Sequence, residues 1–441
     1  MPAPAPLDTR PLRIALLVYR GNPHSGGQGV YVRHLSKELV ALGHHVEVFS
    51  GPPYPELVPE VPLVKVPSLD LYRSGDPFRV PHPREFHSIA DLTEFALMCT
   101  AGFPEPLTFG MRVRRVLRDR RGDFDIVHDN QCLANGILGL LADGFPVVAT
   151  VHHPITVDRD LELSHATSPI RKLTLRRWFG FLRMQIRVVR KLPRIITVSE
   201  SSKRDIAAQL GVDLDRMTVV PVGVDQTHFR PLPDIARVPG RIMTTASADV
   251  PMKGLVPLLE AVAKVRTERA VELVVVGRPR EGSIIPATIE RLGLEGAVEF
   301  VGGVGHDRIV ELYAEAEAAV VPSLYEGFSL PAIEAMACGV PLVATTGGAL
   351  PEVVGRHDET ALLVPPGDSG ALAAAISRLL DDPALRTRIG AAGRARVFER
   401  YTWAATAAGT VAQYRAALQA AELQAAELKA AALEAARRRA C

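Results

Sequence analysis

The stretch RIALLVYRGNPHSGGQGVYVRHLSKELVALGHHVEVFS, residues 13–50, decides the fold class. Residues 13–19 form an apolar run without alternation, which is typical of a strand buried on both faces of a parallel sheet. A glycine-rich loop over 20–29 follows, the apolar spacing predicts a helix over 30–42, and residues 45–50 have the pattern of a second strand. This strand–loop–helix–strand order predicts a doubly wound α/β fold.

The same order recurs in two series of segments. The first series continues with strands predicted at 125–128, 146–151, 194–198 and 218–222, and Ser199 is the expected N-cap of the helix after 194–198. The second series has strands predicted at 241–246, 272–277, 298–301, 319–322 and 341–345. Two series predict two Rossmann-like domains, which join near 222–240, where prolines cluster.

These patterns divide the chain into four parts. We expect an N-terminal domain over 1–222, a C-terminal domain over 223–400, a helix over 401–418, and a tail over 419–441 rich in Ala, Glu and Leu. Leucines recur every five residues in that tail, which places each about 140° around a helix from the last. The tail is therefore expected to be a solvent-exposed helix without a coiled-coil seam.

The composition excludes several classes of protein. Of the 441 residues, 47% are hydrophobic and 23% charged, which is ordinary for a soluble globular protein and excludes extensive disorder. A net charge of +2 argues against a nucleic-acid partner. The four cysteines lack CxxC spacing, and the N-terminal arm lacks a signal-peptide pattern, so a cytoplasmic location is expected.

Basic residues concentrate in the first half of the chain. Residues 1–218 hold 28 Lys and Arg against 23 Asp and Glu, and 163–199 contain no acidic residue. A helix predicted over 168–192 carries Arg176, Arg177, Arg183 and Arg187. This basic face suits an anionic surface on the inner side of the membrane or an acceptor molecule, and equally a helix face that only meets solvent.

Two short motifs have the chemistry of anion binding. Gly26 and Gly27 lie in Ser-Gly-Gly-Gln-Gly between the first strand and the first helix, where backbone N–H groups can approach a phosphate, or where the glycines simply form a turn. Lys253-Gly254 follows the strand predicted at 241–246. Its ammonium could meet a diphosphate, or it could be a solvated side chain at a helix start.

The strongest motif is YEGFSLPAIEAMACG, residues 325–339. It places Glu326 before a glycine turn and Glu334 inside the helix that follows. The residues between them, at the helix start, offer free backbone N–H groups. Such a motif can bind an anion through N–H donors and hydroxyl groups through carboxylates.

With its neighbours, this motif resembles the signature of retaining glycosyltransferases of family 4, which have the GT-B fold. The other agreeing positions occur in the family's order along roughly residues 12–418: Gly26-Gly27, Asp125-Ile-Val-His128, Val198-Ser-Glu-Ser201, Val220-Pro-Val-Gly-Val-Asp225, Lys253-Gly254 and Tyr401-Thr-Trp403. The resemblance implies two Rossmann-like domains that face each other across a cleft. It also implies that the helix at 401–418 crosses back to the first domain.

The resemblance also implies roles. The first domain would bind the acceptor, and the second would bind a nucleoside diphosphate sugar, linked to uridine or guanosine. The diphosphate would be held by Lys253 and by the backbone of Gly327, Phe328, Ser329 and Leu330. Glu334 would bind the ribose hydroxyls, and Glu326 would contact the transferred sugar. Gly26 and Gly27 would let the N-terminal loop approach the donor and the acceptor. His152 corresponds to the family's histidine near the sugar, with the adjacent His153 as the alternative.

The chemistry so implied is sugar transfer with retention, without a metal, a further cofactor or an enzymic nucleophile. Asp123-Phe-Asp125 and Asp158-Arg-Asp160 spell the Asp-x-Asp of metal-dependent transferases, but the first lies at the start of a strand that matches the GT-B pattern. One departure stands out: Ser247 and Ala248 occupy the positions of the family's usual second diphosphate cation. Arg278 or Arg280, after the strand at 272–277, is the candidate replacement.

Other functions remain open on the sequence. A non-catalytic sugar-nucleotide-binding or scaffold protein would explain the missing arginine. Another GT-B enzyme, such as a phosphorylase or a sugar-nucleotide epimerase, shares the fold, and a nicotinamide oxidoreductase rests on the Rossmann pattern alone. The transferred sugar and the acceptor (a glycan, a lipid or a small molecule) are not specified by these residues.

Overall fold

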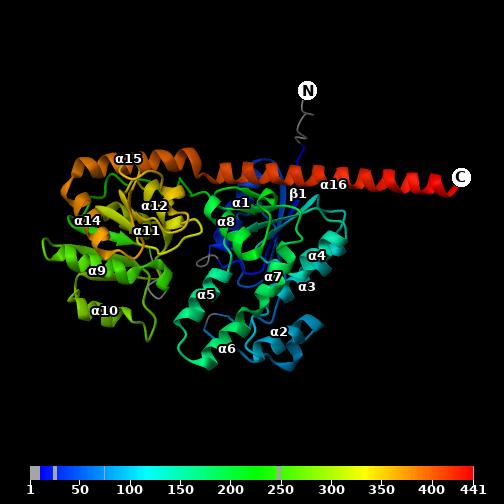
Figure 1. Ribbon diagram of the computed structural model, residues 1–441, viewed down its shortest axis with the longest axis horizontal. Coiled ribbons are helices and arrows are strands. Elements are labelled where there is room, and N and C mark those ends of the chain that lie inside the picture. The colour runs from blue at the N-terminus through cyan, green and yellow to red at the C-terminus, as the bar shows by residue number, and fades with distance from the viewer. Residues whose placement is uncertain (1–9, 23–26, 74, 246–249, 441) are drawn as a thin grey trace, which may run out of the picture. The chain divides into compact units, whose positions relative to one another are not determined.

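The computed structural model describes residues 10–22, 27–73, 75–245 and 250–440. The chain forms two compact units, which Figure 1 colours from blue to red along the sequence. Unit 1 comprises the chain up to Thr197, Lys203–Val220 and the residues from Ala407 onward. Unit 2 comprises Val198–Ser202 and Pro221–Thr406, so the segment 198–202 lies outside the unit in which the sequence placed it.

Unit 1 is built on a seven-stranded parallel sheet with the order β3-β2-β1-β4-β5-β6-β7. Its strands are β1 Arg13–Val18, β2 His45–Ser50, β3 Leu63–Lys65, β4 Ile126–Asn130, β5 Val147–Val151, β6 Ile195–Thr197 and β7 Met217–Val219. From β1 the strands are added on one side as β2 and β3, and then on the other side as β4 to β7, so the strand order reverses between β1 and β4. In doubly wound sheets ligands bind outside the carboxyl ends of the strands at this reversal.

Helices cover both faces of this sheet. They are α1 Gln28–Ala41, α2 Ile89–Cys99, α3 Glu105–Arg118, α4 Asn135–Ala142, α5 Thr156–His165, α6 Pro169–Trp178, α7 Leu182–Val189 and α8 Glu200–Leu210, with short 3₁₀ turns at Pro83–Glu85, Phe179–Phe181 and Leu214–Arg216. Val127 packs into the core formed with α3, α4 and α7. Its neighbour His128 contacts the C-terminal helix, because successive strand residues face opposite sides.

Unit 2 repeats the design with six parallel strands in the order β10-β9-β8-β11-β12-β13. They are β8 Arg241–Thr244, β9 Glu272–Val276, β10 Val298–Val301, β11 Ala318–Val321, β12 Leu342–Thr345 and β13 Leu362–Val364. Its helices are α9 Leu255–Arg266, α10 Ile285–Leu292, α11 His306–Glu315, α12 Leu330–Ala337, α13 Leu350–Val354, α14 Ser369–Asp381 and α15 Pro383–Arg400, with a 3₁₀ turn at Pro251–Lys253. The expectation of two doubly wound domains is confirmed.

Two local features differ from what the sequence predicts. The short strands β3 and β13 were not predicted. The single helix expected over 168–192 is instead two helices, α6 and α7, separated by the 3₁₀ turn Phe179–Phe181. Gly180 lies in this turn, and glycine weakens a helix interior by about 1 kcal/mol.

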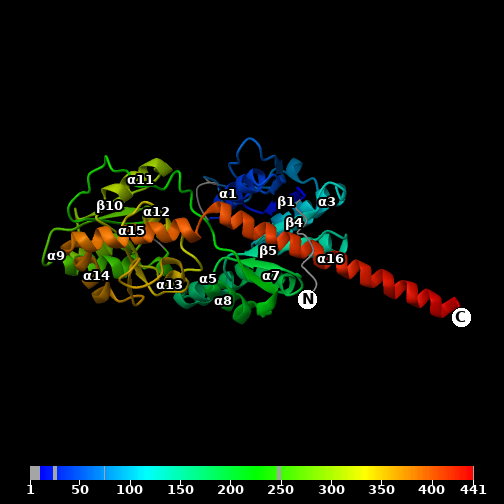
Figure 2. The same ribbon diagram turned by 90° about the horizontal axis from the view of Figure 1, so that it is seen from above.

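The C-terminal helix α16, Trp403–Ala440, is continuous through the segment that the sequence divided at 418. From Ala407 onward it belongs to unit 1, where Tyr414 is fully buried and its hydroxyl lies 2.6 Å from Nδ1 of His128. Nε2 of the same ring lies 2.7 Å from Oγ1 of Thr150. Figure 2 shows α16 running across unit 1 and then projecting beyond it. The contact at Tyr414 therefore helps to attach the helix, whose far end extends beyond the rest of unit 1.

Replacing Tyr414→Phe should destabilise unit 1 by about 1–3 kcal/mol, because it leaves a buried nitrogen of His128 without its partner. Calorimetry should show a lower Tm for this variant. Leu423→Ala, on the same helix but at a side chain that is 60% exposed, is the matched control and should leave Tm unchanged. Equal effects of both substitutions would contradict the proposed attachment.

Candidate functional site

The site in unit 2 lies at the reversal point of its sheet. β8 and β11 are neighbours there, and β9 lies on the other side of β8. Lys253 comes from the loop after β8, and Glu326 comes from the loop after β11. A backbone hydrogen bond of 2.7 Å from the N–H of Leu324 to the carbonyl of Met252 joins the two loops. Adjacent parallel strands thus bring together residues that are far apart in the sequence.

Lys253 and Glu326 form a bidentate ion pair. Nζ of Lys253 lies 2.8 Å from Oε1 and 3.0 Å from Oε2 of Glu326, and the hydroxyl of Ser323 donates to Oε1 at 2.7 Å. The Glu326 side chain is almost buried, whereas that of Lys253 is one-third exposed. The carboxylate is therefore held by two donors at a fixed place, with the ammonium between it and solvent.

Gly254 makes this arrangement possible. Its φ is +69°, and a Cβ at this position would collide with the carbonyl oxygen of Pro322. Gly254 is also the N-cap of α9, so the helix begins directly after the lysine. The glycine that the sequence pairs with Lys253 is thus required both by its backbone conformation and by the close approach of the loop after β11.

The residues between Glu326 and α12 form a tight, strained turn. Ser329, the N-cap of α12, has φ +111°, a conformation that costs a non-glycine residue of order 1–3 kcal/mol, and its buried Oγ has no partner among the described residues. Phe328 is buried against Tyr401, with ring centroids 5.6 Å apart. The carbonyl of Gly327 accepts hydrogen bonds from Ser199 and Ser202 at 2.6 and 2.9 Å. The turn is therefore held both by ring packing at Phe328 and by hydrogen bonds at Gly327.

Within α12, burial raises the pKa of Glu334 to about 7. Leu330, the first residue of the helix, precedes Glu334 by one turn. Free N–H groups at this helix start and a carboxyl group one turn further thus come from a single element. Such an arrangement can accept an anion at the turn and hydroxyl groups at Glu334.

Arg278 follows β9 at the same edge of the sheet and is exposed. A Cβ on Gly302 would lie 2.5 Å from Cγ of Arg278, so the absence of a side chain there leaves room for the arginine. Arg278 therefore lies at the same edge of the sheet as Lys253 and Glu326. Ser247 and Ala248 lie outside the described residues.

In unit 1, His152 lies just after β5 in a hydrogen-bonded cluster. Its Nε2–H donates to Oδ1 of Asn130 at 2.8 Å, and its backbone N–H donates to Oε1 of Gln131 at 2.7 Å. Its ring lies edge-on to Tyr31, with centroids 4.8 Å apart. Burial lowers the pKa of His152 to about 3, so the imidazole is neutral at physiological pH. By contrast, His153 pairs with Asp158 at 2.8 Å on a half-exposed surface.

The loop after β4 supports this cluster. Gln131 and Leu133 both have positive φ, and the buried carboxylate of Asp129 accepts from the N–H groups of Cys132 and Leu133 at 3.2 and 2.8 Å. Burial raises the pKa of Asp129 to about 7. The sequence analysis missed Asn130 and Gln131. The polar run 128–131 at the end of an otherwise apolar strand was the available signal.

The glycine loop is only partly described. Gly27 is the N-cap of α1 with φ +73°, and a Cβ there would meet nothing within 4 Å, so only its backbone conformation calls for glycine. Gly26 lies outside the described residues.

The four arginines of the basic face lie on two helices: Arg176 and Arg177 are on α6, and Arg183 and Arg187 are on α7. All four side chains are exposed, and none pairs with a carboxylate in the described part of the chain.

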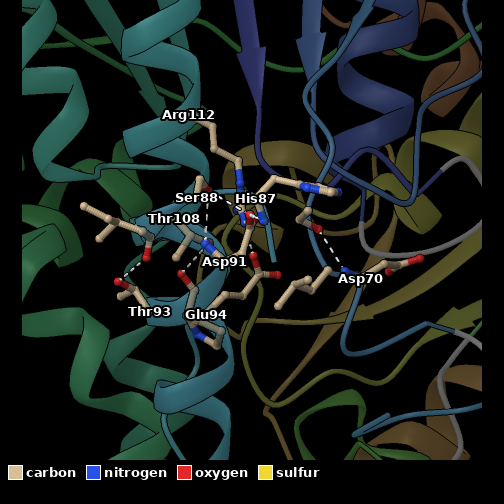
Figure 3. A network of polar contacts seen from close by, with 12 residues as sticks. Asp70, His87, Ser88, Asp91, Thr93, Glu94, Thr108 and Arg112 are labelled. Carbon is tan, nitrogen blue, oxygen red and sulfur yellow. Dashed lines mark hydrogen bonds and ion pairs between the residues drawn. The ribbon is translucent and has the colours of Figure 1, made fainter. Parts of the chain in front are cut away.

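A polar network that the sequence did not predict fixes α2 against α3 (Figure 3). Arg112 of α3 donates to Asp91 at 2.6 Å and to Glu94 at 2.5 Å. Asp91 also accepts from the N–H of His87 and from the hydroxyl of Ser88, at 2.9 and 2.8 Å. This network therefore fixes α2 against the middle of α3.

Comparison with known proteins gives this geometry a context. Residues 25–228 match the sequence pattern of the family described as Glycosyltransferase Family 4, and residues 236–396 match that of Glycosyl transferases group 1. Over 408 residues the chain is 53% identical to the MMP alpha-(1->4)-mannosyltransferase of Mycolicibacterium hassiacum, covering 92% of this chain and 98% of that protein. The chain belongs to glycosyltransferase family 4. It is a glycosyltransferase with the GT-B fold.

More distant similarities agree with this assignment. The D-inositol 3-phosphate glycosyltransferase of Kineococcus radiotolerans is 30% identical over 445 residues, covering 92% of this chain and 96% of that protein. Among solved structures, sucrose-phosphate synthase from Thermosynechococcus elongatus is 25% identical with a TM-score of 0.71, covering 93% and 100% of the two chains. The Anabaena protein Alr3699/HepE in complex with UDP, at 18% identity and a TM-score of 0.66 over 91% and 98%, shares the fold.

Within the described residues, no helix of this glycosyltransferase is long and apolar enough to cross a membrane. Within the same residues, no group of three or more His, Cys, Asp or Glu side chains is arranged to hold a metal ion.

Substituting Gly254→Ala should destabilise unit 2 and displace Lys253, because the new Cβ meets both an unfavourable φ and the carbonyl of Pro322. Gly293→Ala is the matched control: its φ is +62°, but a Cβ there meets nothing within 4 Å, so it isolates the cost of positive φ, about 1–2 kcal/mol. Urea unfolding should show a larger loss for Gly254→Ala. Equal losses would show that the contact with Pro322 relaxes.

Replacing Glu334→Gln should change how stability depends on pH. The pKa of Glu334 is about 7 in the folded protein and near its ordinary 4.5 when unfolded, so the folded state holds this proton more tightly. Stability of the parent protein therefore falls as pH rises from about 4.5 to about 7. Without nucleotide, Tm of the variant relative to the parent should rise across this window. Parallel Tm profiles would contradict the raised pKa.

Proposed function

We propose that this enzyme transfers a mannosyl group from a nucleoside diphosphate mannose to the 4-hydroxyl group of a sugar acceptor, with retention of configuration. The observation that carries the proposal is the 53% identity, over nearly the whole of both chains, to a protein named as an alpha-(1->4)-mannosyltransferase. A (1→4) linkage requires an acceptor with a hydroxyl at ring position 4, which favours a sugar over a lipid or another small molecule.

The donor site consists of the groups gathered at the reversal point of unit 2. The ammonium of Lys253 and the N–H groups at the start of α12 bind the diphosphate, and the carboxyl group of Glu334 binds the ribose hydroxyls. Arg278 supplies a second cation in place of the residue absent at 247 or 248. The complex of Alr3699/HepE with UDP supports a nucleotide donor for this fold, and the base remains uridine or guanosine.

The mechanism rests on electrostatic stabilisation of the departing diphosphate. Lys253 and the helix start oppose the charge that develops on the leaving phosphate, in place of a metal ion. When no enzymic nucleophile takes part, an α-linked product from an α-linked donor requires that the acceptor hydroxyl attack on the face that the diphosphate leaves. Glu326 is bound by Lys253 and Ser323, so it serves to orient Lys253 and the sugar rather than to attack.

His152 contributes as a neutral hydrogen-bonding group. Its pKa of about 3 excludes a charged imidazolium at working pH, and Asn130 and Tyr31 fix the plane of the ring. A neutral, oriented imidazole can bind a sugar hydroxyl without placing a positive charge beside the forming oxocarbenium centre.

We further propose a cytoplasmic location, where nucleotide sugars are available. Contact of the basic face with an anionic membrane stays a prediction. The exposed side chains of Ile170 and Leu173 on α6, beside Arg176, support it. Sedimentation with anionic vesicles at low and high salt tests it.

Incubation with nucleoside diphosphate mannose and an α-(1→4)-linked mannoside should yield a product whose new linkage is α by NMR, with the rate unchanged by a chelator. Lys253→Ala should lower kcat about 10²-fold or more, since it removes a charge that acts on the leaving group. Arg278→Ala should weaken donor binding, while Gly293→Ala leaves both quantities unchanged. A β-linked product, or loss of activity with chelator, would contradict retention or metal independence respectively.

A further inference from the structure

Unit 1 contains an aromatic cluster that the donor chemistry does not use. Its members are Tyr72, Phe78, Phe103, Trp178 and Phe181, which come from the segment before α2, the loop before α3, and the region around α6. The ring centroids of Tyr72 and Trp178 lie 5.5 Å apart, those of Phe103 and Trp178 5.1 Å, and those of Phe103 and Phe181 5.3 Å. Aromatic residues are only 5% of the chain, so this is a marked local concentration.

The cluster is not a closed core. Phe78 is 60% exposed, and the rings of Phe103, Trp178 and Phe181 are each partly exposed. A cavity of about 230 Å³ opens beside Phe103 and Phe181, whereas Tyr72, Phe78 and Trp178 are not part of its lining. At about 30 Å³ for each water molecule in the liquid, this space holds about eight waters, which is comparable to one monosaccharide unit. Its lining includes Phe103, Phe181, Met184, Asn135, Arg177 and Arg187.

The polar groups of the cavity are arranged as hydrogen-bond donors. Arg177 is oriented by a hydrogen bond of 2.8 Å from Nη2 to the hydroxyl of Thr100. Neither Arg177 nor Arg187 pairs with a carboxylate in the described part of the chain. A sugar ring has apolar C–H faces and a rim of hydroxyls, so it meets aromatic faces and guanidinium or amide donors at the same time. The mainly apolar lining with few polar groups is typical of a small-ligand site.

Hydrogen bonds connect the elements that line the cavity to the loop that holds His152. The side-chain amide of Gln185, on the same helix α7 as Met184 and Arg187, donates to the carbonyl of Cys132 at 3.1 Å. Cys132 follows Gln131, whose side chain accepts from the backbone N–H of His152. Asn135 is the first residue of α4 and directly follows the loop that contains Gln131 and Cys132. The network of Figure 3 in turn fixes α2, which leads into the Phe103 loop.

We propose that this aromatic cluster and its cavity bind a sugar unit of a neutral oligosaccharide acceptor, one or more residues away from the unit that receives the mannosyl group. This proposal rests on the proposed function and names its acceptor class. We expect the site to favour a chain of sugars over a single sugar, because only a chain can place one unit at the reaction point and another in the cavity.

The test compares two acceptors at saturating donor: an α-(1→4)-linked mannotetraose and methyl α-mannoside. Phe103→Leu and Phe181→Leu, both in the cavity lining, should each raise KM for the tetraose about tenfold, while KM for the monosaccharide and the rate of donor hydrolysis change by less than about twofold. Leucine keeps most of the apolar volume of both side chains, so the variants should fold. Leu214→Ala, at a residue of unit 1 that is 51% exposed and outside the cluster and the cavity lining, is the matched control and should change none of these values.

Direct binding gives a readout that does not depend on catalysis. The chain has two tryptophans, Trp178 and the buried Trp403. The tetraose should change the fluorescence of the parent protein in a saturable way, and Trp178→Phe should abolish that change. If the parent protein transfers mannose to neither acceptor but shows this change, the proposed function fails and the subsite stands.

Three results would overturn the subsite. The first is an unchanged KM for the tetraose in both cluster variants. The second is an equal rise in KM for the two acceptors. The third is the absence of any saturable fluorescence change in the parent protein while transfer to the tetraose proceeds.

Discussion

The adjacency of β8 and β11 is the constraint on which the candidate donor site depends. A parallel sheet places the carboxyl ends of its strands at one edge, so the loops after these two strands must meet. That meeting pairs Lys253 with Glu326 and explains why the turn must be so compact. Gly254 has to let the two loops touch, and Gly348 has to lie against the backbone of Glu326, where a side chain would collide. The conformations of the glycines thus follow from the strand order.

A second consequence concerns charge. Glu326 is almost buried, and an unpaired buried carboxylate would be costly. Lys253 and Ser323 offset that cost in the absence of substrate, and they also keep the ammonium beside the start of α12. Glu334 differs from Glu326, because burial raises the pKa of Glu334 to about 7. Two carboxyl groups eight residues apart therefore differ in character because their surroundings differ.

Unit 1 uses the same edge of its sheet for a different kind of chemistry. His152 is neutral and held by amide groups, and the surface beyond it is aromatic and aliphatic with arginine and asparagine donors. Such a surface offers both apolar contacts and hydrogen-bond donors to a ligand. The ion pairs of Arg112 with Asp91 and Glu94 join α2 to α3, and these helices contribute Leu97 and Leu107 to the lining of the cavity.

The sequence by itself determined the two doubly wound domains, because buried parallel strands leave unbroken apolar runs and their loops carry glycines. It also determined the family, because Glu326, Glu334 and Lys253 occur within long, ordered motifs. The sequence did not determine which side chains from distant segments contact one another. The amides that hold His152, the division of the basic helix at Gly180, the bond between Tyr414 and His128, and the aromatic cluster all join segments that are distant along the chain. No local pattern encodes such contacts, since only the packing of helices on the sheet brings those side chains within reach of one another.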